Sequence, residues 1–230
     1  MPGFFITGTD TGVGKTRVAA ALLQAYGRLG YRCVGMKPVA AGASLQDGVW
    51  RNEDVELLRQ AGNVQASGEC LNPYLFRAAI APHIAAEHKG VNIELARIRA
   101  AYTHLTQLAE VVVVEGAGGL LVPLSPGRDM GDLAVALGLP LVLVVGMRLG
   151  CLNHALLTWE AIQARNLRLA GWVANRLDPS MAAYEENLAT LVRRLPVPLL
   201  AELPHQAGMD AASMARLFAP KRLYAMLRQG

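Results

Sequence analysis

The stretch FFITGTDTGVGKT, residues 4–16, constrains the fold more than any other part of the sequence. A short apolar run leads into a loop rich in glycine and threonine, and helical apolar spacing follows over residues 17–29. The nucleotide-binding P-loop has the pattern Gly-x-x-x-x-Gly-Lys-Ser/Thr between a strand and a helix. The end of the loop fits this pattern, but the place of the first glycine is taken by Thr9, with Gly8 one position too early. The stretch still predicts a strand, a phosphate-binding loop and a helix.

The residue types in this loop suit a phosphate chain. Gly12 and Gly14 allow the backbone to turn its N–H groups inward, and a helix that begins near Lys15 directs its positive end at the same place. The Lys15 ammonium can reach terminal phosphates, and the Thr16 hydroxyl can ligate Mg²⁺. The alternative is a glycine-rich turn with a solvated lysine. The strand, the helix and the Lys-Thr pair together favour phosphate binding.

Apolar runs of strand length recur along the chain and alternate with helical patterns. Besides residues 4–7, these runs are 32–39, 111–119, 140–146, 169–175 and 196–204. Runs that are apolar on both faces predict an α/β fold, P-loop NTPase-like, with a mainly parallel sheet and helices on both faces. Residues 42–100 are less regular, and we expect an irregular insertion there. No Pro-, Gly- or Ser-rich linker divides the chain, which predicts a single P-loop α/β domain over residues 1–230.

Composition argues against several classes of protein. A net charge of +4, scattered Lys and Arg and 6% aromatic residues do not form a nucleic-acid-binding surface. Three widely spaced cysteines without a CxxC motif indicate reduced thiols in a cytoplasmic protein. The longest apolar stretch, residues 133–147, contains Gly138 and Pro140, so it predicts a helix end and a strand rather than a membrane span. We therefore expect small-molecule substrates.

Two charged residues are expected where ligands of open parallel sheets bind, at the carboxyl ends of strands. Glu115 in VVVVEGAGG can complete an Mg²⁺ site opposite Thr16, or it pairs with a surface lysine. Lys37 in GMKPVAAG can stabilise developing negative charge, or it is an ordinary lysine with its ammonium in solvent. Asn52 is expected to cap a helix with Asp54 in its first turn, where pairing with the helix dipole explains the acid without a function.

Several motifs together make the chain resemble the dethiobiotin synthetases. They are TGTDTGVGKT, KPVAAG, NEDVELL, NPY, APHIAA, VVVVEGAGGLLVPL, LVVGMRLGCLNHALLT, GWVANRLDP and LAELP, in order from about residue 4 to about residue 206. The resemblance implies an ATP- and Mg²⁺-dependent, homodimeric ligase of biotin biosynthesis. Such a ligase closes a cyclic urea from 7,8-diaminononanoate and CO₂, through a carbamate and a carbamic-phosphoric anhydride. This route needs positioning and positive charge rather than a protein nucleophile.

The resemblance also implies roles for individual residues. The implied catalytic residues are Lys37, Lys15 and Thr11, and the implied Mg²⁺ ligands are Thr16, Asp54 and Glu115. The implied ATP-binding residues are Gly12, Val13, Gly14, Lys15, Thr16, Arg17, Asp54, Glu115, Gly116, Ala117, Gly118, Asn175, Arg176, Pro204, His205 and Gln206. The implied substrate-binding residues are Lys37, Ala41, Gly118, Gly150, Cys151, Leu152 and Asn153. The last four are implied to face the active site of a second subunit; the alternative is ordinary helix capping by Asn153.

The chain departs from the family pattern at three positions. Ala41 replaces a common serine, Asn187 replaces an expected tyrosine, and Gly12 replaces an acidic residue found in some members. The first two changes put two substrate contacts in question.

Two other classes share this type of loop. Nucleotide-switch ATPases of the partition or septum-positioning type carry an additional lysine early in the loop, where this chain has Thr9 or Asp10. Their membrane-bound forms end in a basic amphipathic helix. The tail here is basic, but Pro220 interrupts it, which favours a packed terminal helix. Amidoligases of cobalamin synthesis carry a glutaminase domain, for which this chain is too short.

Overall fold

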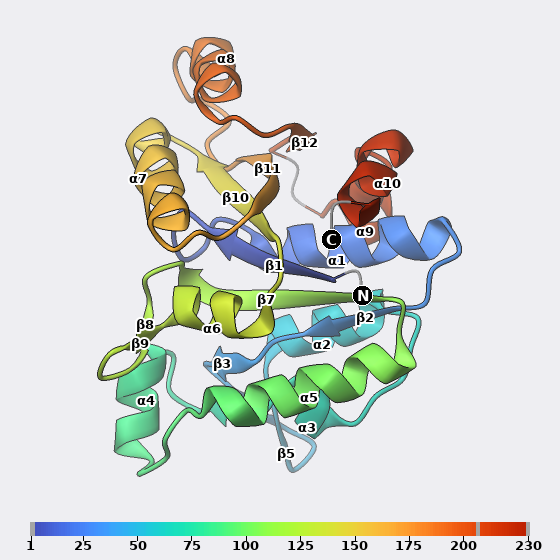
Figure 1. Cartoon of the computed structure of the whole chain (residues 1–230), viewed down its shortest axis with the longest axis vertical. Coiled ribbons are helices and arrows are strands. Elements are labelled where there is room, and N and C mark those ends of the chain that lie inside the picture. Colours follow the sequence, from blue (N-terminus) through green and yellow to red (C-terminus); the bar gives the residue numbers. More distant parts are fainter. Residues whose placement is uncertain (1–2, 206–207, 229–230) are drawn as a thin grey trace.

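The computed structural model describes residues 3–205 and 208–228. Its centre is a six-stranded parallel sheet with the strand order β12-β11-β10-β1-β7-β2, seen from β12 at the top of Figure 1 downwards. The strands are β1 (Gly3–Gly8), β2 (Cys33–Met36), β7 (Val111–Gly119), β10 (Leu141–Met147), β11 (Leu169–Arg176) and β12 (Leu199–Leu203). Each of the six predicted apolar runs forms one of these strands, so the predicted parallel α/β fold is confirmed.

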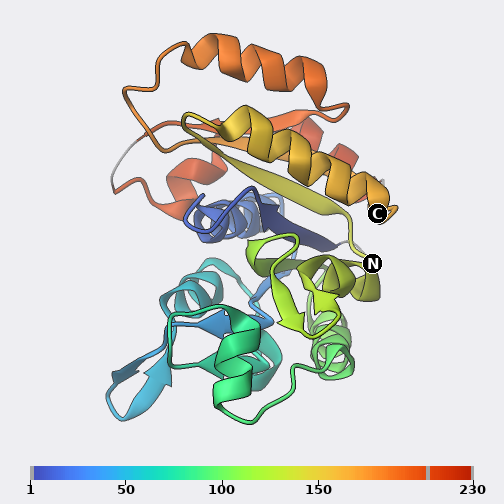
Figure 2. The ribbon, with the colours of Figure 1, turned by 90° about the vertical axis from the view of Figure 1, so that its left-hand side faces the viewer.

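Helices cover both faces of this sheet (Figures 1 and 2). Alternate residues of β7 point to opposite faces: Val112 and Val114 belong to one hydrophobic layer, Val111 and Val113 to the other. The first layer includes side chains of α3 (Gly68–Leu71), α4 (Pro82–His88), α5 (Leu95–Leu108), α6 (Met130–Leu137), α7 (Cys151–Ala164) and α8 (Tyr184–Arg194). The second includes side chains of α1 (Lys15–Arg28), α2 (Glu53–Ala61), α9 (Ala211–Ala215) and α10 (Pro220–Arg228). Burial on both faces explains why the strands read as continuous apolar runs.

Residues 42–100 are more regular than we expected, so the predicted irregular insertion was wrong. The strands β4 (Ser44–Gln46) and β5 (Val49–Arg51) form an antiparallel hairpin that projects from the body in Figure 2. Beside it, β3 (Val39–Ala41) pairs in parallel with β6 (Tyr74–Phe76), and the helices α2 to α5 begin in the same region. Each of these four strands has 3 residues, too few for a periodic pattern to show in the sequence.

Other local predictions are confirmed. Gly138 ends α6 with a φ of 64°, and β10 follows as the predicted strand. Pro220 begins α10, and the α10 side chains Leu223 and Met226 are buried in the second hydrophobic layer, together with side chains of α1. The terminal helix is therefore packed. Within the described ranges, no helix has both the length and the apolar character needed to cross a membrane.

Candidate active site

The glycine loop connects β1 to α1, which begins at Lys15 as predicted. Gly12 and Gly14 have φ angles of 75° and 88°, in the left-handed region that favours glycine. A Cβ atom on Gly14 would lie 2.3 Å from Nδ2 of Asn175, so there is no room for a side chain. Asn175 lies on β11 and donates from Nδ2 to the carbonyl oxygen of Val13 at 2.8 Å. Its amide therefore braces the loop from a neighbouring strand.

Four side chains from four segments form one hydrogen-bonded cluster beside the loop, which we call the charged cluster: Thr16, Lys37, Asp54 and Glu115. Lys37 follows β2 directly, and its Nζ lies 2.9 Å from Oδ2 of Asp54 and 2.5 Å from Oε1 of Glu115. The Thr16 hydroxyl lies 2.8 Å from Oδ1 of Asp54 and 2.9 Å from Oε1 of Glu115. The sequence predicted each residue at a sheet edge or helix start, and the structure brings all four together.

The charged cluster is held in a largely buried setting. Glu115 and Lys37 are only 1% and 5% exposed, while Asp54 is half-buried. Burial lowers the pKa of Lys37, but the Glu115 and Asp54 carboxylates outweigh it and raise that pKa above its usual value. Burial raises the pKa of Asp54, but the Lys37 ammonium outweighs it and lowers the pKa overall. Burial keeps the pKa of Glu115 raised against the opposing effect of Lys37. Lys37 is therefore a cation at neutral pH.

The position of Glu115 differs slightly from the expectation. We placed it at the carboxyl end of its strand, but β7 continues to Gly119. Its Cα is in register with Ile6, two residues before the end of β1. Glu115 therefore lies near the carboxyl end of β1, from which the glycine loop leaves, although its own strand runs further.

The oxygen atoms of the charged cluster fit Mg²⁺. Oε2 of Glu115 is buried without a hydrogen-bond partner, which is unfavourable unless a ligand supplies one. No group of three or more His, Cys, Asp and Glu in residues 3–205 and 208–228 has the arrangement of a metal site. An Mg²⁺ ion here would therefore rest on Asp54, Glu115 and the Thr16 hydroxyl, with phosphate and water oxygens as the other ligands.

A cavity of about 730 Å³ opens over the charged cluster. One wall is polar and carries the loop residues Thr11, Gly12, Gly14, Lys15, Thr16 and Arg17 together with Lys37, Asp54 and Glu115. The remainder is largely apolar and includes Val39, Ala41, Leu57, Ile80, Pro82, Ala117, Gly118 and Val122. Sequence reasoning did not identify Val39, Leu57, Ile80, Pro82 or Val122. The APHIAA motif was the available signal for Pro82, but nothing local in it indicates a cavity wall.

Some predicted site residues do not line this cavity. Val13 and Gly116 are buried beside it. Arg176 donates to the Pro179 carbonyl and lies 4.4 Å above the ring of Tyr184. Pro204 and His205 are exposed after β12, and Gln206 lies outside the described residues. A role of these residues and of Asn175 in binding adenine stays a prediction.

The segment Gly150, Cys151, Leu152 and Asn153 also lies away from the cavity lining. Gly150 is the N-cap of α7 with a φ of 93°, and Cys151 is the first helical residue and is buried. Asn153 is exposed inside the first turn. The alternative that Asn153 caps the helix was therefore wrong, because the left-handed glycine already begins the helix. Contacts of this segment with a second subunit stay a prediction.

Asp10 and Asn72 make contacts that hold Lys15 and Lys37, and the sequence did not reveal these contacts. The backbone carbonyl of Asp10 accepts a hydrogen bond from Lys15 Nζ at 2.9 Å, and the Asp10 carboxylate pairs with Arg148 at 2.6 Å. Asn72, in the NPY motif, donates from Nδ2 to the Lys37 carbonyl at 2.5 Å and to the Tyr74 carbonyl at 3.0 Å. The glycine loop is therefore connected to Arg148, and the backbone at Lys37 is connected to Asn72, both far away in the sequence.

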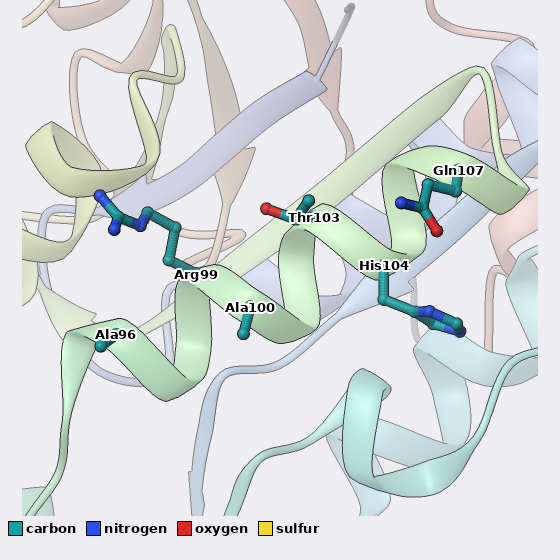
Figure 3. A pocket seen from close by; sticks show the side chains of 6 residues that line it. All are labelled: Ala96, Arg99, Ala100, Thr103, His104 and Gln107. Atoms are coloured by element: carbon teal, nitrogen blue, oxygen red, sulfur yellow. The ribbon is translucent and has the colours of Figure 1, made fainter.

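A smaller hollow, of about 390 Å³, lies along α5 (Figure 3). Its lining combines Arg99, Thr103, His104 and Gln107 with two alanines. It carries no carboxylate and no glycine loop, so it offers nothing comparable to the chemistry of the charged cluster.

Comparison with known proteins agrees with this geometry. The family model described as AAA domain matches residues 2–213. The ATP-dependent dethiobiotin synthetase BioD of Aromatoleum aromaticum is 56% identical over 212 residues, which cover 92% of this chain and 94% of that protein. The same enzyme of Nitrosospira multiformis is 52% identical over 221 residues, or 96% of each chain.

Solved structures show the same fold. The septum site-determining protein MinD of Pyrococcus horikoshii, complexed with Mg-ADP, has a TM-score of 0.58 at 17% identity and covers 99% of this chain and 93% of its own. The cell division ATPase MinD of Pyrococcus furiosus has a TM-score of 0.58 at 18% identity and covers 100% of this chain and 99% of its own. At such low identity, the likeness establishes the P-loop NTPase fold and nothing more.

Proposed function

The chain belongs to the ATP-dependent dethiobiotin synthetase family, and from this premise we propose that it makes dethiobiotin through a carbamate and a carbamic-phosphoric anhydride. The substrates are 7,8-diaminononanoate, CO₂ and ATP. The observation that carries the proposal is Lys37: a cation buried between two carboxylates, beside the glycine loop and at the base of one cavity. Identities of 52–56% also favour this function over a septum-positioning switch ATPase, to which the likeness is one of fold.

The reaction has three steps, and the proton that each attacking amine releases passes to solvent water. One amine of the substrate attacks CO₂ and loses a proton, giving a carbamate. A carbamate oxygen then attacks the γ-phosphorus of ATP, forming a P–O bond as ADP leaves. The second amine attacks the carbamoyl carbon, loses a proton and expels phosphate, which closes the five-membered urea. Phosphorylation is needed because a carbamate oxygen is otherwise a poor leaving group.

The residues of the cavity supply position and charge for these steps. The backbone of the glycine loop and the ammonium of Lys15 hold the phosphate chain. Lys37 turns from the carboxylates towards the γ-phosphate and carbamate oxygens, where negative charge builds up. Thr11 lines the same cavity and offers a hydroxyl to the phosphates. The apolar wall limits water and so protects the anhydride from hydrolysis.

The charged cluster would also hold the metal ion. Thr16, Asp54 and Glu115 are the proposed Mg²⁺ ligands, and the unpartnered Oε2 of Glu115 supports this assignment. When bound, Mg²⁺ neutralises negative charge on the phosphate oxygens.

We propose that the enzyme is one domain and works as a homodimer. Both hydrophobic layers share the one central sheet, which supports the single domain. Leu149 is 95% exposed and precedes the start of α7, the segment that the family resemblance implies faces the active site of a second subunit. Contact with a second subunit at this position would bury the leucine side chain.

The direct test of the proposed function is product formation. The protein, incubated with the diamine, labelled bicarbonate, ATP and Mg²⁺, should place the label in an acid-stable cyclic urea and release ADP and phosphate in equal amounts. Omission of the diamine should leave only background turnover of ATP. If the rate of ATP hydrolysis does not depend on the diamine or bicarbonate, but rises with a membrane or nucleic-acid surface, the switch-ATPase alternative would be favoured.

Binding of ATP should take up protons near pH 8. Burial is the main cause that lowers the pKa of Lys15 to about 8 in the free protein, and phosphates beside the ammonium would raise it again. Lys15 then binds its proton more tightly in the complex than in the free protein. The affinity for ATP is therefore highest below pH 8 and falls as the pH rises above 8. At pH 8 we expect uptake of about half a proton per ATP, because about half of the free lysine is then neutral.

Calorimetry in buffers of different ionisation enthalpy measures this uptake. Lys15→Arg is the matched control, because arginine stays charged and should remove the buffer dependence. The same heat in all buffers for the unchanged protein would contradict the prediction.

A further inference from the structure

Asn52 is a buried polar residue that the proposed reaction does not use. It is 7% exposed and forms the N-cap of α2, where its Oδ1 accepts from the Val55 N–H at 3.3 Å. Its Nδ2 donates to the carbonyl oxygens of Ala41 at 3.3 Å and Gly42 at 3.1 Å. A helix cap needs only the acceptor oxygen. The two donated hydrogen bonds therefore have a separate effect.

These bonds join the two segments that meet in the charged cluster. Ala41 ends the strand that follows Lys37, and Asp54 lies in the first turn of the helix that Asn52 caps. Lys37 and Asp54 are themselves joined at 2.9 Å. The ion pair and the Asn52 side chain thus connect the same two segments at different points, and the two connections close a small ring.

The turn that Asn52 contacts begins where β3 ends. Gly42 has a φ of 85°, and the chain turns there from β3 into the hairpin that projects in Figure 2. Its N–H donates to the Ala78 carbonyl, whereas its own carbonyl accepts from Asn52. Ala41 lines the cavity, so a shift of this turn would change the cavity wall and the approach of Lys37 to Asp54 together.

We infer that Asn52 is a positioning residue, which fixes Asp54 and the Ala41–Gly42 turn relative to Lys37 and thereby sets the geometry of the Mg²⁺–ATP site. The inference rests on the proposed function. Only an amide provides an acceptor for the helix and two donors for the carbonyls. Serine and aspartate also cap helices, but aspartate has no donor and serine is shorter with a single one.

The test compares Asn52→Ser and Asn52→Asp with a control at the other end of α2. Asn63 follows α2; its Oδ1 accepts from the Cys33 N–H at 2.7 Å and its Nδ2 donates to the Tyr31 carbonyl at 2.9 Å. Asn63→Asp therefore makes the same chemical change in a similar bridging amide, away from the cavity lining. Calorimetry without the diamine measures the affinity for ATP with Mg²⁺ and with EDTA, and thermal unfolding measures Tm.

Both Asn52 variants should weaken binding of ATP with Mg²⁺ by about tenfold, the size expected from losing one or two buried hydrogen bonds. Binding in EDTA should change by less than about twofold, and the Mg²⁺ concentration for half-maximal turnover should rise in parallel. Asn63→Asp should lower Tm without changing either affinity. If the added charge of Asn52→Asp prevents folding, Asn52→Ser alone provides the test.

Three results would overturn the inference. If Asn52→Ser binds ATP with Mg²⁺ as the unchanged protein does, Asn52 is only a helix cap. If affinity falls equally with Mg²⁺ and with EDTA, or falls equally in Asn63→Asp, the effect is general destabilisation. If the unchanged protein binds ATP with the same affinity in Mg²⁺ and in EDTA, Mg²⁺ does not contribute to binding and Asn52 cannot position a site for it. Failure of the proposed function would look different: binding of ATP with Mg²⁺ would persist but no cyclic urea would form.

Discussion

Replacing Lys37 by alanine should lower kcat by a factor of about 10² to 10³, the usual effect of removing one group that stabilises charge in a transition state. Lys37 is the buried cation closest to both carboxylates, and the proposed reaction builds negative charge on phosphate and carbamate oxygens beside it. The KM for ATP should change much less, because the glycine loop and Lys15 still hold the phosphates. Steady-state kinetics with varied ATP separates the two effects.

The same variant should respond more strongly to Mg²⁺ than the unchanged protein. Without the ammonium, Glu115 and Asp54 lose the cation that lies between them, and Lys15 is left as the nearby lysine whose charge acts on both. Mg²⁺ then has more negative charge to neutralise. We expect a larger rise in Tm on adding Mg²⁺ to Lys37→Ala than to the unchanged protein. Lys89→Ala is the control, since Lys89 is exposed on the end of α4 and should leave kcat unchanged. An unaltered kcat in Lys37→Ala would refute the catalytic role.

The sheet and the glycine loop could be predicted because their signals are local. Each central strand is apolar on both faces, and the loop joins β1 to a helix that begins at its own lysine. The short strands β3 and β6 were missed because a segment of 3 residues has no measurable period, and each is stabilised by its partner rather than by its own sequence. Local sequence patterns therefore predicted the elements that bury long apolar faces, and they missed the strands of 3 residues.

The charged cluster was predictable residue by residue but not as a set of contacts. Lys37 and Glu115 are 78 positions apart, and only the pairing of β2 with β7 brings them to 2.5 Å. The sequence suggested a solvated lysine or a surface ion pair as alternatives, and it held no information on their burial. Asn52 was recognised as a helix cap, yet its second set of bonds depends on two backbone carbonyls of a distant turn. A cap bonds to its own helix and so leaves a local pattern, whereas bonds to a backbone 10 or 11 positions away do not.

Replacing Glu115 should have the largest combined effect on stability and activity. Glu115→Ala leaves the buried Lys37 with Asp54 as its one remaining carboxylate, and it opens a cavity in β7. Breaking a buried ion pair by removing one partner costs about 3–5 kcal/mol, so we expect a loss near the lower end of that range because Asp54 remains. Glu115→Gln keeps the shape and accepts the same hydrogen bonds, so its free energy of unfolding should fall by less, about 1–2 kcal/mol. Urea denaturation measures both values.

The glutamine variant separates the charge of Glu115 from its packing. It should lose about 10²-fold in kcat/KM and need more Mg²⁺ for half-maximal turnover, because an amide oxygen is a weaker ligand than a carboxylate. Glu110→Gln is the matched control: Glu110 precedes the same strand, is exposed and pairs with Arg32 at the surface. A double variant, Lys37→Ala with Glu115→Gln, should be less destabilised than the sum of the single variants, because neither charge is then left unpaired in the interior. If stabilities simply add and Glu115→Gln keeps its Mg²⁺ requirement, Lys37 and Glu115 do not act as one coupled site, and the proposed metal ligand would have to be sought elsewhere.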